Sequence, residues 1–375
     1  MRKKLTFMSM VLLGAVLLSA CAGGAIRGSS WPGLTADADT AYLAGGGFVY
    51  AVNLRDGSEI WHYPASANSK QVFYAAPVLT PEGLIIIGSA GTDFSLIAID
   101  PSDINPETNS PVEAWTFTEA KDHWVASPLV VDNKLFAPNA DGNLYIFDLT
   151  DGQSQKQAVK VVELAGRLWA QPVSDGERVF VTSLDHSVFA VDVNTYDIVW
   201  HEEVGGAIPG SPVIAEDGML YVGSLASQLE QFDLQTGQHN SVLDANEWIW
   251  STPVVDGDAL YFGDLEGNFY SFSISTGELN WSVKPDGPIT ANALVQNGHL
   301  LLATESGIVY AISKEDGQTL WFEDVKDQGE TVNGKIYTSP VTAGDVILIA
   351  PLETEFHLIA LDTDGRKVWT FVPEN

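Results

Sequence analysis

The chain has 375 residues, 45% of them hydrophobic, which is enough to bury a large core. It carries 18 Lys and Arg against 49 Asp and Glu, a net charge of −31, and so lacks the basic face that nucleic-acid binding needs. Its single cysteine excludes an internal disulfide, so packing must hold the fold together.

The first predicted element is an export signal over residues 1–20. Three basic residues follow the initiating methionine and precede an uncharged, mainly apolar run. That run is shorter than the ~20 residues that span a bilayer, which favours a removable signal over a transmembrane helix. Its end, Leu18 to Cys21, resembles the lipobox of bacterial lipoproteins, which implies cleavage before Cys21 and lipidation of that cysteine. An ordinary secretory signal that ends near a cysteine is the alternative.

The segment after the signal predicts where the protein resides. Residues 21–29 are expected to form the lipidated cysteine and a short tether, and residues 30–375 a single domain. Ala22, in place of Asp, resembles lipoproteins sent to the outer membrane and facing the periplasm in diderm bacteria. In a monoderm host the protein would lie on the outer face of the cell membrane. In either host, the lipid on Cys21 is expected to attach the protein to the membrane.

An internal repeat determines the predicted fold. A proline followed by an apolar residue, here called the anchor, recurs along the chain, with Ala in place of Pro in one of the eight copies. The eight anchors are Pro32, Pro77, Pro128, Pro172, Pro212, Pro253, Ala293 and Pro340. A closing tryptophan recurs with the anchor, at Trp61, Trp115, Trp200, Trp281, Trp321 and Trp369, with Val162 and Val242 at the two remaining places. Units of about 40 to 45 residues are typical of propeller blades, so both patterns predict eight blades.

Within each unit, short runs rich in β-branched and aromatic residues alternate with Asp-Gly, Asn-Gly and Thr-Gly turns. Such runs predict strands and hairpins, and no stretch has a helical period. We therefore expect an all-β, eight-bladed propeller of four-stranded antiparallel blades. Two insertions, at 100–114 and 326–335, are expected to be surface loops.

One repeated run that ends in the closing tryptophan resembles a known family. The run from Ala190 to Trp200 matches the pattern A-x-D-x-x-T-G-x-x-x-W, with Tyr196 in the Gly place. This resembles the pyrroloquinoline quinone (PQQ)-type propeller repeat, found in quinoprotein dehydrogenases and in non-enzymatic lipoproteins. We expect the six closing tryptophans to be structural, with the indole between adjacent blades and its N–H available for a partner.

The residues argue against an enzyme. The quinoprotein dehydrogenases that the repeat resembles carry a vicinal cysteine pair, a calcium site and a catalytic aspartate, and the only cysteine here is Cys21. The histidines are dispersed without metal-ligand spacing, so no catalytic, cofactor or metal residue is predicted. The favoured hypothesis is a scaffold that binds protein or peptide partners in the cell envelope. Its layout is similar to the lipoprotein subunit of the outer-membrane β-barrel assembly machinery. A PQQ-dependent dehydrogenase and a sugar- or peptide-binding envelope sensor are the alternatives.

The residues just before each anchor give the candidate binding site. The fourth residue before it is apolar in seven units, and the third is aromatic in four of them, which is unusual for a uniform core position. These positions open the innermost strands and should surround one end of the central axis. The candidate partner-binding residues are Tyr74, His123, Trp124, Arg167, Trp169, Trp248, Trp250 and Tyr337. Packing of these rings between blades is the alternative.

Overall fold

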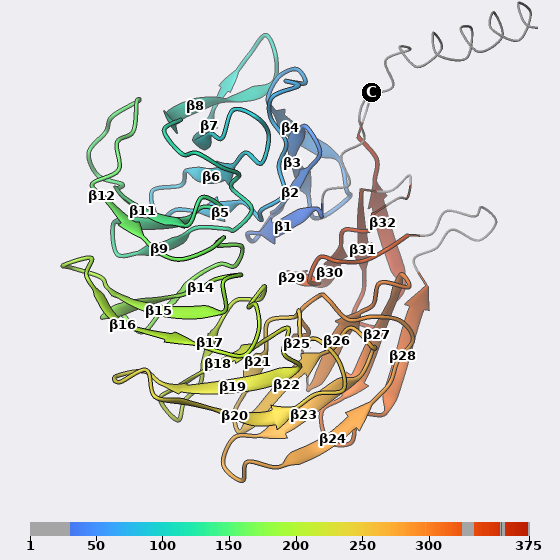
Figure 1. The fold of residues 1–375 in the computed structure, drawn as a ribbon. Coiled ribbons are helices and arrows are strands. Elements are labelled where there is room, and N and C mark those ends of the chain that lie inside the picture. The colour runs from blue at the N-terminus through green and yellow to red at the C-terminus, as the bar shows by residue number, and fades with distance from the viewer. Residues whose placement is uncertain (1–30, 297, 325–333, 353, 355–356, 374–375) are drawn as a thin grey trace, which may run out of the picture.

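The computed structural model describes residues 31–296, 298–324, 334–352, 354 and 357–373. In this part of the chain every regular element is a β-strand, and the strands form eight four-stranded antiparallel sheets arranged around one axis (Figure 1). The predicted all-β, eight-bladed propeller is therefore confirmed. The predicted signal peptide, Cys21 and the tether lie outside the described residues.

Each blade consists of four consecutive strands, with the first nearest the axis and the fourth on the outside (Figure 1). Blade 1 contains β1 (Gly33–Ala36), β2 (Thr40–Gly45), β3 (Phe48–Asn53) and β4 (Glu59–Tyr63), and blade 2 contains β5 (Val78–Leu79), β6 (Ile85–Gly88), β7 (Leu96–Asn105) and β8 (Ser110–Phe117). Blade 3 contains β9 (Leu129–Val131), β10 (Lys134–Pro138), β11 (Asn143–Asp148) and β12 (Lys160–Glu163), and blade 4 contains β13 (Val173–Ser174), β14 (Arg178–Thr182), β15 (Ser187–Asp192) and β16 (Ile198–Glu203). Blade 5 contains β17 (Val213–Ile214), β18 (Met219–Gly223), β19 (Gln228–Asp233) and β20 (His239–Asp244), and blade 6 contains β21 (Val254–Asp256), β22 (Ala259–Gly263), β23 (Phe269–Ser273) and β24 (Leu279–Val283). Blade 7 contains β25 (Leu294–Gln296), β26 (His299–Ala303), β27 (Ile308–Ser313) and β28 (Thr319–Asp324), and blade 8 contains β29 (Val341–Ala343), β30 (Val346–Ile349), β31 (Leu358–Leu361) and β32 (Lys367–Phe371).

The hydrophobic core lies between the blades. The second and third strands are buried on both faces, as in β14 and β23, where every residue is buried. Each apolar cluster combines side chains of two adjacent blades; one joins Leu43 of blade 1 to Leu348 of blade 8. A strand that packs on both faces needs apolar residues throughout, which explains why the middle strands are continuous apolar runs.

The ring closes without exchange of strands between the first and last blades, since β1–β4 and β29–β32 are each continuous in sequence. Closure depends on contacts between blades 8 and 1. The indole Nε1 of Trp369 donates to the carbonyl of Leu54 at 2.9 Å, and the Thr338 hydroxyl donates to the Pro32 carbonyl. Packing of the first apolar cluster completes the seam.

The closing tryptophans lie between adjacent blades. A β-bulge places Trp200 opposite the small Ala190, leaving room for the indole. Its Nε1 donates to the Leu234 carbonyl of blade 5 at 2.9 Å, and Trp281 does the same to Lys314 of blade 7 at 3.0 Å. The turn glycine of the next blade packs against the indole, as in the pairs Gly57–Trp369, Gly237–Trp200, Gly317–Trp281 and Gly365–Trp321. Trp115 differs, because its buried Nε1 has no partner and the buried Lys156 ammonium lies 5.5 Å from its ring centre.

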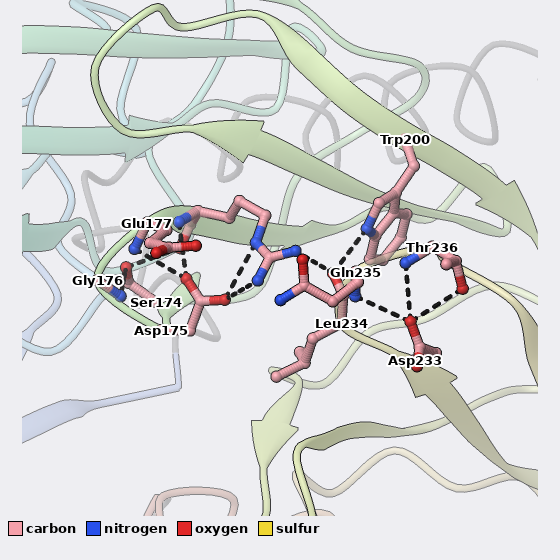
Figure 2. A network of polar contacts seen from close by, with 10 residues as sticks. Ser174, Asp175, Gly176, Glu177, Trp200, Asp233, Leu234, Gln235 and Thr236 are labelled. Carbon is pink, nitrogen blue, oxygen red and sulfur yellow. Dashed lines mark hydrogen bonds and ion pairs between the residues drawn. The ribbon is translucent and has the colours of Figure 1, made fainter.

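Figure 2 shows the junction of blades 4 and 5, where hydrogen bonds from both blades hold the turn that contacts Trp200. The Asp233 carboxylate accepts bonds from the backbone N–H and hydroxyl of Thr236, at 2.8 and 2.9 Å. The buried Arg178 guanidinium donates to Asp175 and, at 2.6 Å, to the Leu234 carbonyl. The carbonyl of Leu234 thus accepts from two blade 4 side chains.

The junction of blades 3 and 4 lacks the tryptophan and replaces its contacts. The buried Val162 pairs with Leu144, two residues beyond the place opposite Ile146 where the register of blade 4 has Trp200 opposite Ala190. Tyr196 of blade 4 stands at the glycine position with φ +64°. The Lys134 ammonium donates at 2.9 Å to the carbonyl of Val193, which is equivalent to Leu234, and lies 4.9 Å from the Tyr196 ring centre. Lysine therefore supplies the hydrogen bond, and tyrosine packs beside the smaller valine.

The insertion at 100–114 is not an irregular loop, contrary to the sequence-based expectation. Its residues lengthen the hairpin of β7 and β8, with Ile104 paired to Pro111. The hairpin reaches the outer strand of blade 1, where the Asn109 amide donates to the Ile60 carbonyl at 3.0 Å and the Ser110 hydroxyl to the His62 carbonyl at 2.7 Å. Backbone groups of β4 thereby gain partners. Most of the second insertion, 326–335, lies outside the described residues.

The disc has two different faces. We call the entry face the one that carries the connections into the first strands (64–77, 118–128, 164–172, 204–212, 245–253, 284–293 and 334–340) and the turns between second and third strands. The opposite, exit face carries the other turns. No helix in the described part of the chain is long and apolar enough to cross a membrane.

Candidate partner-binding site

The fifth residue before the anchor has a fixed backbone and a variable side chain. Its carbonyl accepts a bond from the entry-face turn of its own blade, as for His123 with Ala140, Arg167 with Leu184 and Trp248 with Leu265, at 2.9–3.1 Å. The same bond recurs at Val72, Ala207 and Pro288. The exposed fractions of the His123 and Arg167 side chains are 45% and 61%, and that of Trp248 is 49%. A constant backbone that presents different exposed side chains is typical of a binding surface.

The fourth residue before the anchor belongs to the core. All seven such residues are at most 1% exposed, namely Phe73, Trp124, Leu168, Ile208, Ile249, Ile289 and Ile336. Trp124 therefore does not lie on the candidate surface, because its ring is buried among Phe117 and Tyr145 and its Nε1 donates to the Phe94 carbonyl at 2.8 Å. An indole whose N–H is satisfied and whose faces are packed has nothing to offer a partner.

The residue directly before the anchor forms hydrogen bonds around the axis. The Thr252 hydroxyl accepts from the Ser211 N–H at 2.9 Å, the Asn292 amide oxygen from Thr252 at 2.7 Å, and the Ser339 hydroxyl from Asn292 at 2.9 Å. Ser127 and Gln171 donate across the preceding junctions. These side chains link the innermost strands of neighbouring blades, so their polar groups are already engaged.

Blade 1 departs from this pattern and creates an aromatic cluster at the axis. Trp31 stands where the other blades have a small or polar residue. Its ring centre lies 5.6 Å from that of Trp250 of blade 6, edge-to-face, and 5.8 Å from that of Tyr337 of blade 8, stacked. We call Trp31, Trp250 and Tyr337 the axial aromatic cluster. Trp31 is 40% exposed, and the other two are partly exposed.

Trp31 is a site residue that the sequence comparison missed. The candidate residues were sought three to five positions before each anchor, which in blade 1 fall within the predicted tether of residues 21–29, and Trp31 stands directly before Pro32. The available signal was an aromatic residue directly before an anchor, where the other units have Ala76, Ser127 or Gln171. Tryptophan at that place is too large for the crowded inner strands and projects outward.

An acidic group borders the cluster. The Glu305 carboxylate, in the turn between β26 and β27, lies beside the Tyr337 hydroxyl and interacts with it electrostatically. Burial raises the pKa of the Glu305 carboxyl above its usual range, although the Tyr337 hydrogen bond and the Lys335 charge act in the opposite direction. Burial and the negative charge of Glu305 together raise the pKa of Tyr337.

His123 and Arg167 meet at a second place on the entry face. The Asp122 carboxylate contacts Nδ1 of His123 and lies 3.9 Å from the Arg167 guanidinium of the next blade. Burial disfavours the charged carboxylate, but the hydrogen bonds from His123 and the Arg167 charge outweigh it and lower the pKa of Asp122. Arg167 retains most of its hydrogen-bonding capacity for solvent or a partner.

Tyr74 and Trp169 occupy the third position before the anchor in blades 2 and 4, as Trp250 and Tyr337 do in blades 6 and 8, and both are half-buried. The Trp169 Nε1 is buried without a protein partner. Thr290 holds the same position in blade 7, and its hydroxyl oxygen is also buried without one. Unsatisfied groups of this kind are met by ordered water or by a ligand.

The axis does not supply the ligands of a calcium–quinone site. The residues directly before the anchors are hydroxyl and amide groups bonded to neighbouring strands, apart from Ala76 and Trp31. Among the described residues no three His, Cys, Asp or Glu side chains are placed to hold a metal ion. The residues directly before the anchors therefore do not fit PQQ with its calcium.

Comparison with known proteins identifies the repeat family. A family model described as "Outer membrane protein assembly factor BamB" matches residues 23–242 and 241–369. The crystal structure of BamB from Moraxella catarrhalis is similar, with a TM-score of 0.68 and 20% identity over 90% of this chain and 96% of that one. The computationally designed Ika8 protein has the same TM-score at 14% identity, over 92% and 98%. At these identities both structures show the fold alone. No curated protein matches the chain.

Proposed function

The chain belongs to the family of the outer-membrane protein assembly factor BamB, and from this premise we propose that it is a non-enzymatic scaffold that binds a protein partner during outer-membrane protein assembly. The partner binds on the entry face, over the axial aromatic cluster and the exposed side chains of His123, Arg167 and Trp248.

The axial aromatic cluster is the observation that carries this proposal. The Trp31 ring of blade 1 contacts the Trp250 ring of blade 6 and the Tyr337 ring of blade 8 at the axis, and all three rings remain partly exposed. Exposed Trp and Tyr that are held in place by packing are typical binding hot spots, since they bury a large area at low cost in side-chain entropy. The surrounding backbone is fixed by the repeat, so the surface is organised before the partner arrives.

Site-specific photocrosslinking in cells tests this function. A photoreactive amino acid at position 248, on the entry face, is expected to give one discrete adduct with a protein of the outer-membrane assembly machinery, identified by mass spectrometry. The control is position 320 on β28, where Leu320 is 57% exposed at the edge of the disc. Identical adducts from both positions, or no adduct from position 248, would contradict the proposal.

We also propose that Cys21 anchors the scaffold to a membrane through a lipid, on the outer membrane facing the periplasm in a diderm host. The support is the resemblance of residues 18–21 to a lipobox. Metabolic labelling with a palmitate analogue is expected to label the wild type and not Cys21→Ser, which should move to the soluble fraction. Labelling of Cys21→Ser would show that the anchor lies elsewhere.

A further inference from the structure

We propose that the axial aromatic cluster recognises an extended segment of the partner in which apolar or aromatic residues stand next to basic ones. This inference rests on the proposed function and specifies the chemistry of the partner. Two observations support it: the exposed rings and the carboxylates beside them.

The rings provide the apolar part of the site. Trp31 stacks on Tyr337 and packs edge-on against Trp250, so its ring is held by the other two, yet Trp31 leaves 40% of its surface to solvent. Trp248, two residues from Trp250, is 49% exposed. Contact with apolar or aromatic side chains removes this surface from water and is favourable in proportion to the area covered.

The charges around the rings select for basic neighbours. Glu305 lies beside Tyr337, where the Lys335 charge balances it in part. The exposed Glu247 directly precedes Trp248, and its carboxylate accepts a hydrogen bond from the Trp248 N–H at 3.1 Å. Lys284, on the connection between blades 6 and 7, is 3.0 Å from Glu266 and is therefore committed to another carboxylate. A Lys or Arg of the partner gains both from these carboxylates and from the indole faces, which attract cations.

The polar groups at the inner strands argue against a sugar as the ligand. The Trp169 Nε1 and the Thr290 Oγ1 have no protein partner, but both atoms are buried from solvent, so a ligand on the surface does not reach them. The neighbouring polar residues directly before the anchors are bonded to one another, so a ligand rich in hydroxyl groups, such as a sugar, finds few free partners there.

A membrane surface is the weaker occupant. Bilayers that contain anionic lipids are repelled by carboxylates, and the chain has a net charge of −31. Glu247 and Glu305 stand beside the tryptophans that would have to enter the lipid headgroups. Charge complementarity therefore favours a basic polypeptide segment over a lipid surface.

Fluorescence anisotropy with labelled peptides tests the inference on the chain lacking residues 1–20. The peptides are Gly-Ser-Phe-Lys-Phe-Lys-Ser-Gly, the same peptide with Glu for Lys, and the same peptide with Ser for Phe. We expect the first peptide to bind and each of the others to bind at least about tenfold more weakly. Equal binding of the Lys and Glu peptides, or no binding by any peptide, would overturn the inference.

Variants locate the site. Trp250→Ala is expected to weaken the Phe-Lys peptide about tenfold, whereas Leu320→Ala at the disc edge should leave its affinity unchanged. The double variant Glu247→Gln with Glu305→Gln should bind the Lys and Glu peptides with similar affinity. An unchanged preference for Lys in that variant would overturn the role of the carboxylates. Vesicles with anionic lipid should not bind, and tight vesicle binding would favour the membrane instead.

The peptide experiment and the crosslinking experiment fail independently. If position 248 crosslinks to an assembly partner while the peptides show no preference, the scaffold function stands and the proposed chemistry of the segment is wrong. If neither gives a positive result, the entry face is not the binding surface. Circular dichroism and melting temperature of each variant show that lost binding does not reflect unfolding.

Discussion

The tryptophans at the blade junctions and those at the axis of the entry face are built differently. Trp200 and Trp369 are less than a tenth exposed, and each donates its N–H to a carbonyl of the next blade. Trp31 and Trp248 are 40% and 49% exposed, and the Trp169 N–H has no protein partner. The first group shares one position that recurs in six of the eight blades, whereas the second is spread over three different positions before the anchors.

This difference separates residues that hold the disc together from residues that are free to bind. Repetition by itself does not make a tryptophan structural; its satisfied N–H and its contact with the turn glycine of the next blade do. Where the tryptophan is missing, at Val162, other residues provide those contacts. Among the described residues, Trp31 and Trp248 remain 40% and 49% exposed, as expected of a surface that binds a partner.

The largest effect on stability is expected from Trp200→Ala. It opens a cavity between blades 4 and 5 and removes the bond to Leu234, so we expect a loss of about 3–5 kcal/mol in the free energy of unfolding. Trp250→Ala should cost about 1 kcal/mol or less, because its ring is partly exposed. Urea denaturation of the two variants measures the difference, and similar losses would remove the distinction between the two groups.

The turn glycines give a matched pair. Both Gly237 and Gly277 have positive φ, +74° and +71°, so alanine at either position costs about 1 kcal/mol in backbone strain. An added Cβ meets Trp200 at 2.8 Å at position 237 but nothing within 4 Å at position 277, where the preceding blade has Val242 instead of tryptophan. Gly237→Ala should therefore be the more destabilising by thermal denaturation. Equal losses would show that the indole does not require glycine.

The junction without a tryptophan is tested by Lys134→Met. This variant keeps the apolar stem and loses the donor to the Val193 carbonyl, so we expect a loss of about 1 kcal/mol. Lys160→Met on the outer strand of the same blade is the control, because Lys160 is exposed. If the two variants unfold at the same urea concentration, the lysine does not replace the missing indole.

The smallest expected effect depends on pH. Burial raises the pKa of Glu230, which is 4% exposed, although His239 at 3.7 Å lowers it in part. An acid with a raised pKa in the folded state contributes stability below its unfolded pKa and loses it as the pH rises through the folded value. Glu230→Gln should therefore raise the melting temperature at pH 7 and have little effect near about pH 4. A variant that is less stable at pH 7 would contradict this sign.

The fold was predictable because two independent sequence patterns, the anchors and the closing tryptophans, show the same eightfold repeat. Trp124 and Phe73 occupy the same apolar position before their anchors, and both are buried in the core. Trp124 was included in the candidate site because it is aromatic, although its position already predicted burial. The replacement of a tryptophan by Lys134 and Tyr196 was not predictable, because these residues are far apart in sequence and meet only across a junction. The insertion at 100–114 pairs as a hairpin because the outer strand of blade 1 offers it free backbone groups.

The candidate site was partly predictable. The aromatic residues three before the anchors identified Trp250 and Tyr337, and the structure brings these two together through Trp31. Trp31 itself stands directly before its anchor, a position that the pattern of aromatic residues three before the anchors does not include. His123, Arg167 and Trp248 share one repeat position, a relation that became visible only through their common backbone hydrogen bond.

The most direct test of the account measures stability and partner binding on the same protein. In the double variant Trp31→Ala with Trp250→Ala, the melting temperature and the photocrosslink from position 248 are recorded together. We predict a melting temperature within about 4 °C of the wild type and loss of the adduct. An intact adduct combined with a large fall in melting temperature would show that the axial tryptophans hold the disc together and do not bind the partner.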